Sequence, residues 1–156
     1  MSSEIKLVAT DIDGVWTDAR MHYTEKGDFM KSFSTYDGMG VQLLNEKNIE
    51  TVIITSENSN IVLQRAKKLN ISNVNIGIQN KLEIIKKICL EKNISLKNVA
   101  YIGDDLNDVD ILNVVGFSAL TKNSPIKNRI KVDYITNKKG GDGAFREFVD
   151  IILKDR

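Results

Sequence analysis

The stretch LVATDIDG, residues 7–14, places two aspartates directly after a run of apolar and small residues. A buried strand commonly ends in a polar turn residue, so one aspartate here would be ordinary. Asp11 and Asp13 are separated by a single residue, so at strand alternation both side chains point the same way and repel each other. The pair therefore predicts a cation close by, at the end of a buried strand.

Apolar, β-branched runs like this one recur along the chain and alternate with amphipathic stretches. The predicted strands are 5–11, 50–56, 74–78, 98–104, 115–119 and 132–136. The predicted helices are 38–47, 59–69, 80–92, 107–114, 125–129 and 143–153. Continuous apolar strands joined by helices are typical of parallel sheets covered on both faces. We therefore predict an α/β fold with a doubly wound, mainly parallel, Rossmann-like sheet.

One segment, WTDARMHYTEKGDFMKSF at 16–33, breaks the alternation. Short alternating runs flank EKGD, which is a turn signal, and predict a β-hairpin with 20–23 paired to 29–33. The hairpin insertion spans about 17–35 within a single domain of 1–156. It is either a surface excursion or a flap near the ligand site or in a subunit contact, because ligands bind at the tips of parallel strands.

Length and composition narrow the class of protein. The 156 residues fit one domain, and 42% hydrophobic with 28% charged residues is globular composition. A net charge of +1 argues against a nucleic-acid partner. The single cysteine allows no intrachain disulfide and favours a reducing, cytoplasmic location. No apolar run reaches the length of a membrane span, and the N-terminus has no apolar signal core.

A second acidic cluster, GDDLND at 103–108, also follows an apolar run. The carboxyl ends of parallel strands line the ligand crevice of an open sheet. If the two runs are neighbours, the carboxylates of five aspartates converge: Asp11, Asp13, Asp104, Asp105 and Asp108. Oxygen ligands at such a mouth suit magnesium, whereas zinc is disfavoured by a chain with one cysteine and one histidine. The sequence therefore predicts an Mg2+ site.

Magnesium beside paired carboxylates suggests phosphoryl transfer. One carboxylate can attack phosphorus, and another two residues on can protonate the leaving oxygen and then activate water. Thr55 ends an apolar run and offers a hydroxyl and a backbone N–H, while Lys81 begins a helix and offers an ammonium to the phosphate oxygens. Singly, Thr55 could merely cap a helix and Lys81 could be solvated. Their order with the two acidic clusters argues against chance.

This ordered set resembles the haloacid dehalogenase superfamily of phosphotransferases. The matching motifs are DIDGVWTD, VIITS, Lys81 and GDDLND, in the order of that superfamily and spread over the whole chain. One departure is Ser56, where glycine often follows the threonine of the second motif.

The resemblance implies a role for each acidic residue. Asp11 is implied as the nucleophile and Asp13 as the general acid/base. Magnesium is implied on Asp11, the backbone carbonyl of Asp13, and Asp104. Asp105 and Asp108 are implied as supporting residues.

The chain is similar, more narrowly, to the capless, tetrameric branch that dephosphorylates 3-deoxy-2-ulosonic acid phosphates. The hairpin stands in place of a cap domain, and three segments match: FSTYDGMGVQLL with Asp37 and Gly38, RAKKLNI, and KGGDGAFREF. The resemblance implies Asp37 and Gly38 at the substrate. It also implies a homotetramer in which the hairpin builds a subunit interface and neighbouring subunits help cover each active site.

The branch contains enzymes for eight-carbon and nine-carbon acids. The eight-carbon type, for 3-deoxy-manno-octulosonate 8-phosphate, usually carries Gly-Arg after the motif-two threonine. The nine-carbon type resembles the combination of Glu57, Arg65 and Lys68 in TSENSNIVLQRAKKL. The combination favours 2-keto-3-deoxy-nononate or sialate 9-phosphate as the substrate, and 3-deoxy-manno-octulosonate 8-phosphate is the second choice. The resemblance also implies a role in lipopolysaccharide or sialic acid biosynthesis. Arg65 and Lys68 lie three positions apart on a predicted helix, so both can contact the carboxylate of one substrate molecule. Alternatively, they belong to an ordinary solvent-exposed face of that helix.

Two other functions fit parts of the pattern. One is a catalytically silent, haloacid dehalogenase-like oligomerisation domain associated with a sugar-acid nucleotidyltransferase. The presence of Asp11, Asp13, Lys81 and Asp104 favours an enzyme instead. The other is a receiver domain, against which stand the spacing of the aspartate pair, the hairpin and the length.

Overall fold

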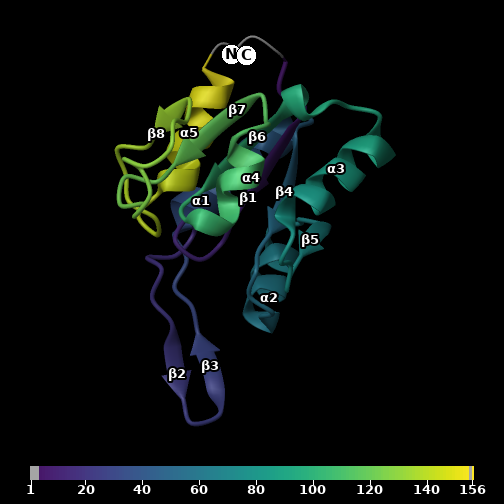
Figure 1. Ribbon diagram of the computed structural model, residues 1–156. Helices are drawn as coiled ribbons and strands as arrows, with labels where there is room; N and C mark the ends of the chain where they lie inside the picture. Colours follow the sequence, from purple (N-terminus) through teal and green to yellow (C-terminus); the bar gives the residue numbers. More distant parts are fainter. Residues whose placement is uncertain (1–3, 155) are drawn as a thin grey trace.

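A six-stranded parallel sheet forms the centre of the molecule in the computed structural model, which describes residues 4–154 and 156 (Figure 1). Across the sheet the strands are β5 (Asn73–Asn75), β4 (Glu50–Ile54), β1 (Leu7–Thr10), β6 (Val99–Gly103), β7 (Phe117–Leu120) and β8 (Tyr134–Ile135). All the pairings between them are parallel. Numbered along the chain, this is the 3-2-1-4-5-6 order of doubly wound Rossmann folds, not the 2-1-3-4-5 order of receiver domains. The predicted fold class is confirmed.

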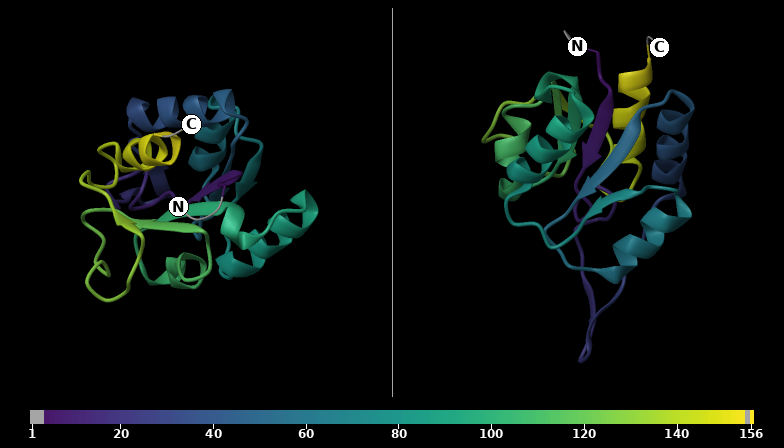
Figure 2. Two further views of the ribbon diagram at one scale, coloured as in Figure 1. Left: turned by 90° about the horizontal axis from the view of Figure 1, so that it is seen from above. Right: turned by 90° about the vertical axis from the view of Figure 1, so that its right-hand side faces the viewer.

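Helices cover both faces of the sheet (Figure 2). They are α1 (Thr35–Glu46), α2 (Asn60–Lys68), α3 (Lys81–Lys92), α4 (Val109–Leu112) and α5 (Ala144–Leu153), with short 3-10 helices at Leu96–Asn98 and Leu106–Asp108. Among the described residues, none of these helices is long and apolar enough to cross a membrane.

Two apolar cores explain why the strand sequences are apolar nearly throughout. On β1, Val8 faces the core shared with α1, α2 and α5, while Leu7 and Ala9 face the core shared with α3 and α4. Because successive side chains of a strand point to opposite faces, both sets of positions have to be apolar when both faces are covered.

Several predicted elements differ from the observed ones. The predicted helix at 125–129 is wrong: this segment forms consecutive turns, closed by short-range bonds such as Arg129 N–H to the Ile126 carbonyl. In a segment this short, few backbone hydrogen bonds offset the cost of nucleating a helix, so the sequence preference decides little. The strand predicted at 74–78 ends at Asn75, shortly before Gly77, whose φ of 66° leaves the extended region. α1 begins before the predicted 38 because Ser34 caps it, accepting from the Tyr36 N–H.

The predicted hairpin is present as β2 (His22–Thr24) and β3 (Gly27–Met30), a separate antiparallel pair. It projects from the carboxyl-end side of the sheet as a narrow arm (Figures 1 and 2). Pairing runs closer to the turn than predicted, with Thr24 opposite Gly27. The turn is therefore two residues long, because strand pairing continues into the EKGD segment.

Candidate active site

The site lies where the order of the sheet reverses, between β1 and β6. These strands are direct neighbours, and the Asp11 N–H donates to the Ile102 carbonyl at 3.1 Å. Asp11 and Asp104 each follow one of the two strands, so their carboxyl groups meet at the switch point where ligands bind in such sheets. Carboxylate oxygens of Asp11, Asp104 and Asp108 lie within 4.8 Å of one another. The two acidic clusters thus converge, as the sequence predicts.

A cavity of about 250 Å³ opens at this edge. It is lined by residues that follow β1, β4 and β6 and by the base of the hairpin: Asp11, Asp13, Ala19, Met21, Thr55, Ser56, Glu57, Asp104, Asp105 and Asn107. Four separate segments of sequence therefore contribute to one small polar pocket.

Gly14 allows the loop after Asp13 to close over Asp104. Its φ is +92°, and a Cβ built on it would lie 1.8 Å from Asp104 Oδ2. A larger residue would be strained and would push the Asp104 carboxyl out of place. The glycine that follows the aspartate pair is thus required by the site itself.

Lys81, the first residue of α3, brings a buried ammonium to these carboxylates. Its Nζ lies 3.1 Å from Asp11 Oδ1 and 2.8 Å from Asp108 Oδ1. Burial alone would lower the pKa of Lys81, but the charges and hydrogen bonds of Asp11 and Asp108 outweigh it and raise the pKa above its ordinary value. Lys81 therefore stays charged beside the pocket.

Asp108 organises the site from behind and has no exposed surface. Its Oδ1 accepts from Lys81 and from the Tyr101 hydroxyl, and its Oδ2 accepts from the N–H groups of Asp104 and Asp105 at 2.8 and 3.3 Å. With both oxygens occupied by protein donors, Asp108 is better placed to hold the loop after β6 than to ligate an ion. Tyr101 carries no sequence signal for this role, because it lies inside an apolar strand.

The charge at the pocket is unbalanced, with the carboxyls of Asp11, Asp104 and Asp108 against the ammonium of Lys81. Burial, followed by the charge of Asp108, raises the pKa of Asp11 well above its usual range. The same causes raise the pKa of Asp104 to about 7. A divalent cation that prefers oxygen ligands would favour the ionised form of both carboxyl groups. Asp11 and Asp104 each have a carboxylate oxygen to offer, so the donors fit such an ion.

The threonine and glutamate of the second motif also reach the pocket. Thr55 is buried directly after β4, and Glu57 is exposed on the loop that follows. The expectation that the Thr55 N–H is available is wrong: it donates to the Asn75 carbonyl at 2.9 Å, because pairing with β5 runs on to this residue. Of the two groups that Thr55 was expected to offer to a phosphate, only the side-chain hydroxyl is left.

Three polar residues of this region escape the sequence prediction. Asn107 donates to the Ser56 hydroxyl at 3.0 Å and so ties the loop after β6 to the loop after β4. The Ser124 hydroxyl donates to the Asp104 carbonyl. Lys31, which follows the hairpin, contacts Asp13 at 2.8 Å. Each contact joins segments distant in sequence, so no local pattern announces it.

Four of the predicted substrate residues do not line the pocket of this chain. Asp37 and Gly38 are buried in the first turn of α1, and Lys68 is exposed at the end of α2. The Arg65 guanidinium lies 5.8 Å from the centre of the Phe33 ring, and one of its nitrogens lies 2.9 Å from where a Cβ of Gly38 would be. Arg65, Asp37 and Gly38 therefore form a second group, apart from Glu57.

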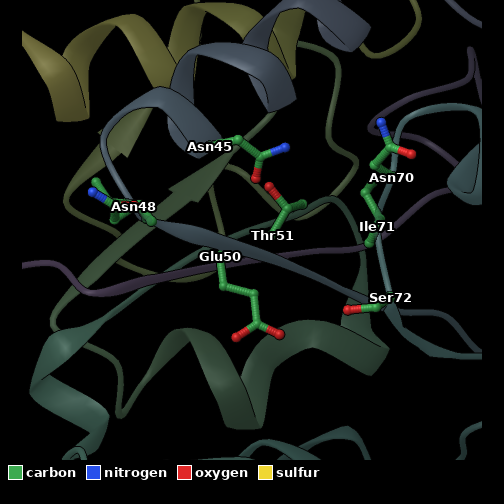
Figure 3. Close-up of a pocket in the computed structure, with 8 residues that line it drawn as sticks. Asn45, Asn48, Glu50, Thr51, Asn70, Ile71 and Ser72 are labelled. Atoms are coloured by element: carbon green, nitrogen blue, oxygen red, sulfur yellow. The ribbon is translucent and has the colours of Figure 1, made fainter.

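A second cavity, of about 320 Å³, lies at the amino end of β4, and Figure 3 shows the side chains that line it. It surrounds the start of β4 at Glu50 and Thr51, and its lining is mainly asparagine and hydroxyl side chains. None of the predicted site residues lies there.

The fold and the pocket define a class of enzyme: a small hydrolase that works with an aspartate pair at the switch point of a parallel sheet. Residues 41–148 match the family described as haloacid dehalogenase-like hydrolase. The chain is 34% identical over 150 residues to 3-deoxy-D-manno-octulosonate 8-phosphate phosphatase of Haemophilus influenzae, covering 96% of this chain and 83% of that protein.

Solved structures agree with this match. The crystal structure of the phosphatase of that name from Moraxella catarrhalis, in complex with a magnesium ion, a phosphate ion and a KDO molecule, has a TM-score of 0.91 and 40% identity over 96% of this chain and 86% of that one. The cobalt-bound deoxy-D-mannose-octulosonate 8-phosphate phosphatase from Haemophilus influenzae has a TM-score of 0.92 and 34% identity over 97% of this chain and 88% of that one.

The chain therefore belongs to the haloacid dehalogenase-like hydrolases, in the branch of the 3-deoxy-octulosonate phosphatases. The predictions of this branch and of a phosphoric monoester hydrolase are confirmed at the level of the family. These relatives carry the names of enzymes, so the alternative of a silent oligomerisation domain gains no support from them.

Proposed function

We propose that this chain is a magnesium-dependent phosphatase that hydrolyses the phosphate monoester of a 3-deoxy-2-ulosonic sugar acid. The observation that carries the proposal is the meeting of Asp11 and Asp104 in one pocket that Asp13 also lines, with the buried ammonium of Lys81 in contact with Asp11. The relatives named above support the substrate class, because both are phosphatases of such an acid.

The proposed reaction assigns a chemical role to each of four residues. Asp11 attacks the phosphorus, and the bond from phosphorus to the sugar oxygen breaks as the bond to Asp11 forms. Asp13 gives its proton to that sugar oxygen, then takes a proton from the water that cleaves the aspartyl-phosphate and releases inorganic phosphate. Lys81 and the Thr55 hydroxyl stabilise the phosphate oxygens while charge moves between the groups.

Asp11, Asp104 and the backbone carbonyl of Asp13 hold the magnesium ion, which when bound supplies positive charge for the phosphate oxygens. Asp105 and Asp108 support this arrangement, Asp108 through its bonds to the loop after β6.

Two lengths of sugar acid compete as the substrate. The names of the relatives support 3-deoxy-manno-octulosonate 8-phosphate. The exposed carboxylate of Glu57 at the pocket supports the nine-carbon acid phosphate, because it can accept from additional sugar hydroxyls. Comparison of kcat/KM on the two compounds decides between them, and a preference for the eight-carbon acid would overturn the role assigned to Glu57 and Lys68.

The test of the reaction is phosphate release from both acids, with enzyme treated with a chelator and then with magnesium restored. Activity should depend on the added ion. Asp11→Asn should lower kcat by roughly 10³-fold or more, as expected for loss of a covalent nucleophile. Asp110→Asn, an exposed carboxylate on α4, is the matched control and should leave the rate unchanged. Full activity of Asp11→Asn would rule out the covalent mechanism.

The assembly belongs to the same proposal. The hairpin exposes large apolar side chains, Tyr23, Phe29 and Met30, which suit a contact with further copies of the chain in a homotetramer. The substrate residues that lie away from this pocket, Arg65 and Lys68 among them, would then act at a neighbouring subunit. The cytoplasmic location and the single working domain stay predictions.

A further inference from the structure

Lys31 is a buried lysine at the root of an exposed arm. It follows β3 directly, and its side chain has no exposed surface, whereas the neighbouring Phe29 and Met30 are 56% and 41% exposed. A buried ammonium costs free energy unless partners replace its water. The contacts that compensate this cost therefore indicate what Lys31 does.

The Lys31 ammonium has three acceptors around it. Nζ lies 2.8 Å from Asp13 Oδ1, 3.6 Å from Asp28 Oδ2 and 3.6 Å from Met21 Sδ. Burial would lower the pKa of Lys31, but the hydrogen bond and charge of Asp13, with Asp28, raise it above its ordinary value. An ammonium has three N–H donors, so each of them has a neighbour within the protein. Lys31 is thus held in place rather than free to follow a phosphate.

The same contact leaves one oxygen of Asp13 without a protein partner. Oδ1 accepts from Lys31, whereas Oδ2 is buried and makes no hydrogen bond to any residue that the structure describes. A buried carboxylate oxygen without a partner is costly, and such atoms in native structures commonly have a functional reason. With Oδ1 held by Lys31, the carboxyl cannot rotate freely, and Oδ2 is the oxygen of this pocket-lining side chain that receives no hydrogen bond from the described residues.

We propose that Lys31 is the positioning residue of Asp13: it fixes Oδ1 so that Oδ2 exchanges the proton with the leaving sugar oxygen and then with water. This rests on the proposed function, in which Asp13 is the general acid/base. When Asp13 Oδ2 gives its proton to the sugar oxygen, negative charge develops on Asp13, and the adjacent ammonium stabilises it. When the attacking water returns a proton to Oδ2, the original state is restored. The hairpin thus supports the chemistry through one ion pair.

The choice of leaving group separates this role from a structural one. An alkyl phosphate, such as the sugar-acid phosphate, needs a proton on its leaving oxygen, while p-nitrophenolate leaves without one. The constant kcat/KM covers the steps up to departure of the first product. The quantity to compare is the ratio of kcat/KM for the sugar-acid phosphate to kcat/KM for p-nitrophenyl phosphate. Lys31→Met should lower this ratio by about tenfold or more, since general acid catalysis is typically worth about 10²–10⁴-fold.

This comparison is insensitive to partial misfolding, because both constants are measured on the same preparation and their ratio does not depend on the amount of active enzyme. Lys31→Arg keeps a positive charge next to Asp13 and should recover much of the ratio. Lys26→Met removes an exposed lysine from the turn of the same hairpin and should leave the ratio at its wild-type value. On the sugar-acid phosphate alone, Lys31→Met should lower kcat and leave KM within about twofold, as for an interaction made in the transition state.

Three outcomes would overturn the proposal. An unchanged ratio in Lys31→Met, with an active wild type, would leave Lys31 a structural residue. A raised KM with unchanged kcat would make Lys31 a substrate-binding residue. Absence of phosphatase activity in the wild type on every compound would overturn the proposed function, and this inference with it.

Discussion

Asp37 shows how a single buried carboxyl can serve the architecture of this protein. It is 1% exposed, its Oδ1 accepts from the Arg146 N–H at 2.9 Å, and its Oδ2 has no hydrogen-bond partner within residues 4–154 and 156. This bond joins the first turn of α1 to the first turn of α5. The resemblance implies Asp37 at the substrate, which stays a prediction, whereas the link to α5 is a structural contact that the fold shows.

Asp37→Asn should remove a pH dependence of stability. Burial raises the pKa of Asp37 to about 6, against the attraction of Arg65 and Arg146. In the unfolded chain the group titrates near 3.8, so between about pH 4 and 6 the folded state binds more protons and stability falls as pH rises. The amide stays neutral and still accepts from Arg146. Relative to wild type, the variant should gain about 2 kcal/mol between pH 4 and pH 7, since one pKa unit corresponds to about 1.4 kcal/mol.

The measurement is urea unfolding across this pH range. Asp110→Asn, which removes an exposed carboxylate of α4, should run parallel to wild type. Parallel curves for Asp37→Asn as well would show that Asp37 is already ionised at pH 4 and is not destabilised by burial.

Among the elements, the glycine-rich segment before α5 supports the loop that carries Asp13. The Gly141 N–H donates to the Val15 carbonyl at 3.1 Å. A Cβ at Gly140 would lie 1.9 Å from the Gly14 backbone oxygen. The two loops are therefore in direct backbone contact, and side chains at this point would separate them.

Gly140→Ala should destabilise the fold and reduce activity together. The added methyl group meets backbone rather than a flexible side chain, so the loop after Asp13 has to move, at a cost of about 1–3 kcal/mol. Thermal unfolding and phosphate release measure the two effects. Gly40→Ala in α1, where a Cβ would lie 3.4 Å from a Val149 methyl, should cost less than 1 kcal/mol because alanine favours a helix. Wild-type stability of Gly140→Ala would mean that the loops can part without strain.

For the whole molecule, the arm formed by the hairpin suggests an assembly. Apart from the backbone pairing of β2 with β3, the tip presents Tyr23 and Phe29 to solvent, 64% and 56% exposed. Exposed aromatic residues on a projecting element favour burial against another surface.

A Tyr23→Ser, Phe29→Ser double variant should therefore have a lower molar mass in solution than wild type, as measured by light scattering on a sizing column. Leu90→Ser is the control, because Leu90 is 82% exposed on α3, away from the hairpin. An identical mass for the double variant would assign the assembly contact to another surface.

Much of this protein follows from local sequence alone. The covered strands are read from their apolar runs, the helices from their amphipathic stretches, and the acidic strand ends from Asp11 and Asp104. These features depend on backbone geometry and on side chains within a few residues, so their periodicity is visible in the sequence. The predictions for the short segments at 125–129 and 74–78 differ from the structure, because so few residues give only a weak preference for helix or strand.

The tertiary structure alone decides which side chains meet. Pairing of β1 with β6 brings Asp11 beside Asp104, and Lys81 then reaches Asp108. The contact of Lys31 with Asp13 follows from the way the hairpin returns to the sheet. Such contacts depend on strand order and on the packing of distant segments, for which neighbouring residues carry no periodic signal. The sequence alone predicted the kind of chemistry, and only the folded chain decided that Lys31 pairs with one carboxylate oxygen of Asp13 and not with the other.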